Sequence, residues 1–211
     1  MKAYINEGIG ALILTILALG GPIWAANKNV MLAYGAALTS LMLACPFSMG
    51  FNPAIMIAQF LAGNREKISR FWPYQVAAQF LGAFIGSLLA TFAIRCSSST
   101  TLPPAALDDL FCSSFSVALG TLSLGFVYLN LKDQPSTQAA ATGLITFAAS
   151  SITNINLLGS FNPAVYLGLV ITGALSWGGF AAATLAVVLG MAGGASLILL
   201  TREQTLPQRP L

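Results

Sequence analysis

The most restrictive feature of this sequence is a four-residue stretch that occurs twice, as Phe51-Asn52-Pro53-Ala54 and as Phe161-Asn162-Pro163-Ala164. Asn is a favourable helix cap and Pro is tolerated at the first helical position, so each copy predicts the start of a helix. Each copy opens a short apolar run that ends near Gly63 or Gly173. Neither run reaches the roughly 20 residues that a membrane-spanning helix needs. Two half-length helices at matching positions predict a binding or permeation site at the centre of an inverted repeat.

The composition places the rest of the chain in a membrane. Of the 211 residues, 56% are hydrophobic and 7% are charged, whereas soluble domains carry about 25% charged residues. Apolar runs and turn signals predict helices over residues 3–24, 30–47, 71–94, 113–131, 138–153 and 177–200. We therefore expect an all-α integral membrane fold with six transmembrane helices and two re-entrant half-helices.

A fixed offset relates the two halves of the chain. Asn162 follows Asn52 by 110 residues (162 − 52), and Gly173 follows Gly63 by the same offset. Three spans in each half turn the second half upside down relative to the first. We expect one transmembrane channel domain over residues 1–211, with a first repeat over 3–95, a second, inverted repeat over 111–200 and a polar tail over 201–211.

Basic residues predict the orientation in the membrane. If the N-terminus is inside, seven of them lie on the cytoplasmic side and only Lys28 and Arg95 lie outside; the seven are Lys2, Arg65, Lys67, Arg70, Lys132, Arg202 and Arg209. Both termini and the tail are then cytoplasmic, in a plasma or inner membrane. We expect the first apolar run to be a retained helix and not a signal peptide, because Asn6 and Glu7 interrupt it early.

Several classes of function are disfavoured by what the sequence lacks. It has no histidine, and its three cysteines, Cys45, Cys96 and Cys112, have no metal-ligand spacing. We expect no metal, no cofactor and no enzymatic step. The net charge of +3 is small and scattered, so we expect no nucleic-acid partner. Cys96 and Cys112 flank one loop, and they are either a disulfide or two free thiols.

The paired Asn-Pro-Ala motifs resemble those of the aquaporin (major intrinsic protein) family. Further similarities lie in the first, second, third and fourth helices, and the resemblance covers residues 3–200; the segments are Glu7-Gly8-Ile9-Gly10, Leu32-Ala33-Tyr34-Gly35, Ala78-Gln79-Phe80-Leu81-Gly82-Ala83 and Gly120-Thr121. The resemblance implies a passive channel for water and a homotetramer in the lipid bilayer, with the half-helices meeting at the centre of the pore.

The residue chemistry fits such a pore. The two half-helix N-termini carry partial positive charge that repels cations. The Asn52 and Asn162 amides offer N–H donors to a passing water. The loops before the motifs offer backbone carbonyls as acceptors, and the expected acceptors are Met49, Gly50, Phe51, Leu158, Gly159 and Ser160. Diameter, hydrogen-bonding groups and electrostatics set selectivity in such channels.

The resemblance also implies a four-residue constriction, which maps to Tyr34, Ser150, Gly159 and Val165. Most family members carry Arg at the position of Val165. Some plant vacuolar members also have Val there and are implicated in passing urea and ammonia. The Asp typical of glycerol facilitators is replaced by Tyr166. We expect permeation by water and by a small neutral solute, with urea, ammonia and glycerol as the alternatives.

Glu7 is the one carboxylate expected inside a span, where a charge is costly and indicates function. The resemblance implies that it braces the first re-entrant loop; alternatively, it lies near the interface and reaches water. The matching acidic position in the fourth helix is Val117, which leaves the second loop without this brace.

Three other functions compete with a channel. A structural or junctional membrane protein of the same fold would show little conduction. A secondary transporter also uses inverted repeats, but coupling to an ion usually needs more intramembrane charges than Glu7 alone. A membrane enzyme would need a His, a carboxylate pair or a metal cluster, and the spans offer none of these.

Overall fold

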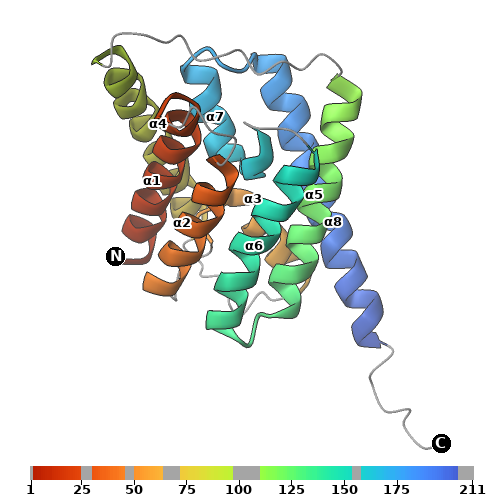
Figure 1. Cartoon of the computed structure of the whole chain (residues 1–211). Helices are drawn as coiled ribbons and strands as arrows, with labels where there is room; N and C mark the ends of the chain where they lie inside the picture. Colours follow the sequence, from red (N-terminus) through yellow and green to blue (C-terminus); the bar gives the residue numbers. More distant parts are fainter. Residues whose placement is uncertain are drawn as a thin grey trace, which may run out of the picture.

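The computed structural model describes residues 2–24, 30–45, 50–63, 72–96, 110–153 and 158–203 (Figure 1). These residues are helical throughout, apart from short turns and loops. The elements are α1 Lys2–Trp24, α2 Val30–Ala44, α3 Pro53–Leu61, α4 Trp72–Cys96, α5 Leu110–Asn130, α6 Pro135–Thr153, a 3₁₀ turn Leu158–Ser160, α7 Pro163–Ile171 and α8 Trp177–Glu203.

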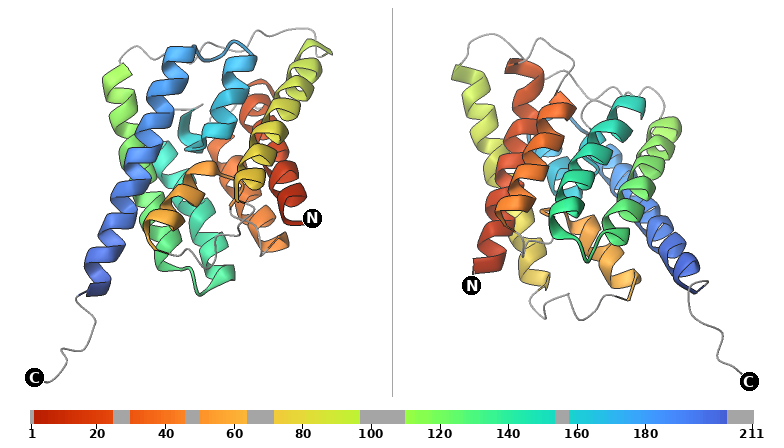
Figure 2. Two further views of the ribbon diagram at one scale, coloured as in Figure 1. Left: turned by 180° about the vertical axis from the view of Figure 1, so that it is seen from behind. Right: turned by 60° about the horizontal axis from the view of Figure 1, so that its bottom comes forward.

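The six long helices pack in a ring around the two short ones. Helix α4 packs on α1, α1 on α2, α2 on α6, α6 on α5 and α5 on α8. The space between α8 and α4 is filled by the short helices, because α3 packs on α8 and α7 packs on α4. Helices α3 and α7 come from opposite ends of the bundle and their N-termini meet near its middle (Figures 1 and 2).

The two tightest helix pairs, α1 with α4 and α5 with α8, occupy equivalent places in the two repeats. Both depend on glycine at the crossing point. A Cβ atom on Gly82 would overlap the Gly8 carbonyl, and one on Gly190 would overlap the Thr121 hydroxyl. Gly86 likewise lies against the Leu12 backbone. Small residues let membrane helices approach this closely, so the glycines of α4 act in packing within the chain.

The outside of the bundle is apolar. Leu81, Phe92, Leu144 and Leu185 are all at least 60% exposed. Among the described residues, three helical segments are long and apolar enough to cross a membrane: Trp72–Ala93, Cys112–Asn130 and Trp177–Thr201. Large contiguous apolar surfaces mark contact with a membrane or a partner. The expected all-α integral membrane fold is confirmed.

Helix boundaries differ from the prediction by two or three residues in five places. Helix α2 ends at Ala44 instead of residue 47, α4 ends at Cys96 instead of residue 94, and α5 starts at Leu110 instead of residue 113. Helix α6 starts at Pro135, three residues before the predicted start at residue 138, because Pro fits the first turn, where its missing N–H is not needed. Helix α8 continues to Glu203, three residues past the predicted end. Cys96 and Cys112 are exposed thiols and form no disulfide with each other.

Candidate pore at the meeting point of the half-helices

Both half-helices start with the same cap. The Oδ1 atom of Asn52 accepts a hydrogen bond from the Ala54 amide at 2.9 Å, and that of Asn162 accepts one from the Ala164 amide at 3.0 Å. Each Asn has extended backbone, and a Pro follows at the first helical position. The two motifs therefore build two equivalent N-termini that point into the middle of the molecule.

The two caps are also bonded to each other's loops. The Nδ2 atom of Asn52 donates to the Phe161 carbonyl and that of Asn162 donates to the Phe51 carbonyl, both at 2.9 Å. Asn52 is 4% exposed and Asn162 is 1% exposed. An amide nitrogen carries two hydrogens, and each of these bonds uses one. The reciprocal pair holds the two positive helix ends beside each other at the centre.

Phe51 and Phe161 adopt an unusual backbone conformation, with φ of 55° and 50°. This left-handed region is uncommon for any residue except Gly and costs of order 1–3 kcal/mol. Both rings are fully buried and lie against glycines, because a Cβ on Gly10 or Gly120 would overlap the facing ring. Packing of the rings thus offsets the strain and fixes the carbonyls that the asparagines bind.

The two loops are braced differently. In the first, the Phe51 amide donates to Glu7 Oε2 at 3.0 Å, and Gln79 Nε2 donates to the same oxygen at 2.6 Å. Glu7 is fully buried, so it does not reach water at the interface. In the second loop, the Phe161 amide donates to the Leu158 carbonyl at 3.1 Å. A 3₁₀ turn therefore replaces the carboxylate that Val117 cannot supply.

The predicted carbonyl acceptors are not equivalent. The Leu158 carbonyl accepts from the Phe161 amide and from the Tyr166 hydroxyl at 2.6 Å, which occupies both of its lone pairs. The Gly159 carbonyl accepts from the Ser150 hydroxyl. Gly50 and Ser160 are both buried, one in each of the two loops that precede the motifs. Met49 lies outside the described residues.

Of the four predicted constriction residues, Val165 is fully buried in the first turn of α7, and the other three come from α2, α6 and the 3₁₀ turn. Ser150 and Gly159 are in direct contact, since a Cβ on Gly159 would lie 2.6 Å from the Ser150 hydroxyl. Tyr34 is 1% exposed, and its hydroxyl interacts with the Asn162 side chain. Tyr34 therefore lies close to the asparagine pair.

A set of buried polar side chains on α3, α4 and α5 was not predicted from the sequence. Gln59 Nε2 donates to the Tyr128 hydroxyl at 2.8 Å. The Oε1 atoms of Gln59, Gln75 and Gln79 are buried and have no protein partner. Comparing the two repeats at the 110-residue offset would have revealed part of it, because the positions that match Gln59 and Tyr128 are apolar.

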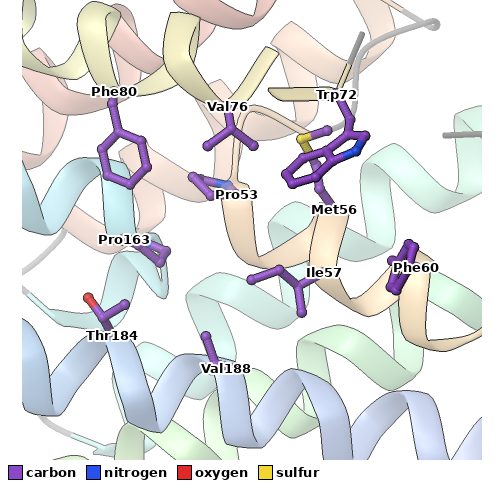
Figure 3. Close-up of a pocket in the computed structure, with 10 residues that line it drawn as sticks. All are labelled: Pro53, Met56, Ile57, Phe60, Trp72, Val76, Phe80, Pro163, Thr184 and Val188. Carbon is purple, nitrogen blue, oxygen red and sulfur yellow. The ribbon is translucent and has the colours of Figure 1, made fainter. Parts of the chain in front are cut away.

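Pro53 and Pro163 also line an apolar groove of about 340 Å³ between α3, α4 and α8 (Figure 3). Trp72 and Phe60 border it and are about half exposed, at 48% and 50%. Among the described residues that line it, Thr184 is the only one with a hydroxyl group, and neither motif asparagine lines it. None of the four predicted constriction residues lines the groove either.

No group of three or more metal-binding side chains occurs among the described residues.

The sequence matches no protein-family model and no curated protein. The fold of the chain does match solved structures. One is an X-ray structure of the aquaglyceroporin from Plasmodium falciparum, with a TM-score of 0.72 and 18% identity over 92% of this chain and 93% of that one. This likeness shows the fold, and the aquaporin-like fold implied by the paired motifs is confirmed.

Proposed function

We propose that this aquaporin-like chain is a passive channel for water and small neutral solutes, with urea, ammonia and glycerol as the candidates. The reciprocal pair of Asn52 and Asn162 is the observation that supports this most directly. It holds two half-helix N-termini together at the centre, where their partial positive charges oppose the entry of cations. Nothing in this arrangement requires a chemical step, so the proposal is a channel and not an enzyme.

The hydrogen-bonding groups at the centre support a specific orientation of a passing water molecule. A water that receives an N–H from an asparagine amide turns its oxygen toward the motif and its hydrogens away from it. Gly50 and Ser160 are the preferred candidates for carbonyl acceptors, because the Phe51, Leu158 and Gly159 carbonyls already accept bonds within the protein. Fixed donors in the middle with acceptors on either side break the continuous hydrogen-bonded file that proton transfer needs.

The small side chains near the second motif support a solute larger than water. Ser150, Gly159 and Val165 carry no charge and little bulk, whereas an Arg at position 165 would contribute both. Diameter and hydrogen-bonding groups set the cut-off of such a pore. The proposal also includes the repeats 3–95 and 111–200 and cytoplasmic termini, which follow from the sequence. It includes a homotetrameric assembly as well, which the resemblance to aquaporins implies.

The test is flux through purified protein in liposomes. Stopped-flow light scattering should show faster shrinkage than empty liposomes in a sucrose gradient, followed by faster re-swelling when urea or glycerol replaces sucrose. A pH-sensitive dye inside the vesicles reports ammonia entry. Water and all three solutes crossing no faster than in empty liposomes would refute the channel and leave a structural role for the fold.

A substitution at Asn162 separates its roles in folding and in permeation. Ser caps a helix about as well as Asn, but it lacks the amide that reaches the Phe51 carbonyl and the permeant. We expect Asn162→Ser to fold and to conduct less water than the parent protein. Circular dichroism checks the helix content. A folded variant with unchanged flux would remove Asn162 from the conduction path.

A further inference from the structure

We propose that Gln59 and Tyr128 form a second constriction on the α3 side of the asparagine pair and determine which neutral solutes pass. This inference rests on the proposed channel function. Gln59 on α3 and Tyr128 on α5 are joined by a hydrogen bond of 2.8 Å and are 7% and 3% exposed. Gln59 comes six residues after Pro53, which is about 9 Å along the helix axis. The bond therefore lies nearly two turns of α3 beyond the Asn52 cap.

Tyr128 belongs to the face of α5 that points into the bundle. Val117, Thr121 and Leu124 precede it at helical spacing, and all of them are at most 1% exposed. A Cβ on Gly50 would lie 3.7 Å from the Tyr128 ring. The ring thus stands beside the first loop, where the Gly50 carbonyl is a candidate acceptor of the pore. Gln138 Nε2 donates to the Tyr128 carbonyl at 2.6 Å and fixes this turn of α5 against α6.

The other repeat shows that the fold does not need this polar pair. At the 110-residue offset, Gln59 corresponds to Leu169 and Tyr128 corresponds to Ala18, and both are fully buried. The offset holds in space, since Gly10 and Gly120 receive the rings of Phe51 and Phe161 in the same way. In the second half-helix and α1, apolar residues thus fill the positions that Gln59 and Tyr128 fill in α3 and α5. The polar pair is therefore a feature of this half alone.

Burying the side chains of Gln59 and Tyr128 also costs stability, and the packing of the helices does not require it. Burying a polar atom without a partner is unfavourable, and Gln59 Oε1 is buried without one. An amide oxygen beside a phenol hydroxyl is a ready binding site for a neutral solute with donors and acceptors, such as urea or glycerol. While Gln59 and Tyr128 bind each other, they narrow the path and withhold the amide N–H and the hydroxyl from the solute.

The proposal predicts that breaking the bond favours the larger solutes. Gln59→Leu introduces the residue that the other repeat carries, and Tyr128→Phe removes only the hydroxyl. We expect the flux of urea and glycerol to rise about two- to tenfold, the equivalent of one neutral hydrogen bond, with a smaller rise for water. Tyr74→Phe, at a position 65% exposed on α4, is the matched control and should leave all fluxes unchanged.

The measurement is stopped-flow flux per reconstituted protein, with thermal unfolding as the check on folding. If the parent protein shows no flux above empty liposomes and the two variants do, the proposal is also supported, because the bond would then close the pore. Two folded variants with the parent's ratio of solute to water flux would overturn it and leave the channel itself intact. If neither the parent protein nor either variant shows flux above empty liposomes, the proposed channel function is wrong, and the proposed constriction is wrong with it.

Discussion

A single side chain decides how the first loop is held. The Phe51 amide is buried and binds Glu7, whereas the equivalent Phe161 amide binds a carbonyl of its own loop. Phe51 also has a left-handed backbone, so its conformation depends on its surroundings. Glu7 contacts both the loop and Gln79 of α4. It therefore ties α1, α4 and the first motif together at one point.

We expect Glu7→Ala to destabilise the protein by about 1–3 kcal/mol, because the Phe51 amide and the Gln79 amide nitrogen lose their shared buried acceptor. Glu7→Gln keeps an oxygen acceptor in place and should cost less. Thermal unfolding in detergent, followed by circular dichroism, measures both. If the Ala variant melts with the parent, the bracing role of Glu7 is wrong.

At the level of the elements, close helix contacts hold each repeat together. Helix α4 meets α1, and α8 meets α5, at glycines whose missing side chains let the two backbones approach. Apolar burial contributes little to helix association in a membrane, because lipid tails are as apolar as Leu; packing and small residues dominate. The bundle is thus sensitive to bulk at a few positions in its contacts.

Gly82→Ala should be destabilising by about 1–3 kcal/mol, the usual cost of an overpacked site, because its methyl group would overlap the backbone oxygen of Gly8. Gly178→Ala in α8 is the control. A Cβ there meets only the Ser176 hydroxyl, at 3.9 Å, and Ala is the better helix former. The midpoints of thermal unfolding should separate the two variants, and equal midpoints would contradict this account of the α1–α4 contact.

At the scale of the whole molecule, the arrangement is an inverted pair of repeats with a polar centre and an apolar exterior. The start of α1 and the end of α8 lie toward the same end of the bundle (Figure 1). Helix α3 enters from that end and α7 enters from the other (Figure 2). Seven of the nine Lys and Arg residues belong to the termini and loops expected on the side of the N-terminus, and this excess predicts that the shared end faces the cytoplasm.

The three cysteines can report this orientation. Cys96 at the end of α4 and Cys112 at the start of α5 are exposed, and Cys45 follows α2 at the opposite end. In single-cysteine variants, a membrane-impermeant maleimide added to intact cells should label Cys96 and Cys112, and Cys45 only after permeabilisation. The reverse pattern would mean that the chain is inserted the other way up.

The class of fold could be predicted from the amino-acid sequence, because it depends on signals between neighbouring residues and on one repeated motif. Apolar runs give the spans, Asn followed by Pro gives the two half-helix starts, and the 110-residue offset gives the repeat. The sequence also showed that Val117 stands where the second repeat would carry the counterpart of Glu7. It did not show how the second loop is held instead, which is by the Leu158 carbonyl in the 3₁₀ turn.

Which groups meet at the centre could not be predicted from the sequence, because it depends on contacts between distant parts of the chain. The bonds from each Asn to the opposite loop join residues more than 100 positions apart, and the bond between Gln59 and Tyr128 spans 69. Hydropathy and capping rules describe neighbours in sequence and carry no information on such pairs. The internal partners of the Leu158 carbonyl and the place of Tyr34 beside Asn162 likewise depend on how the loops pack between the helices.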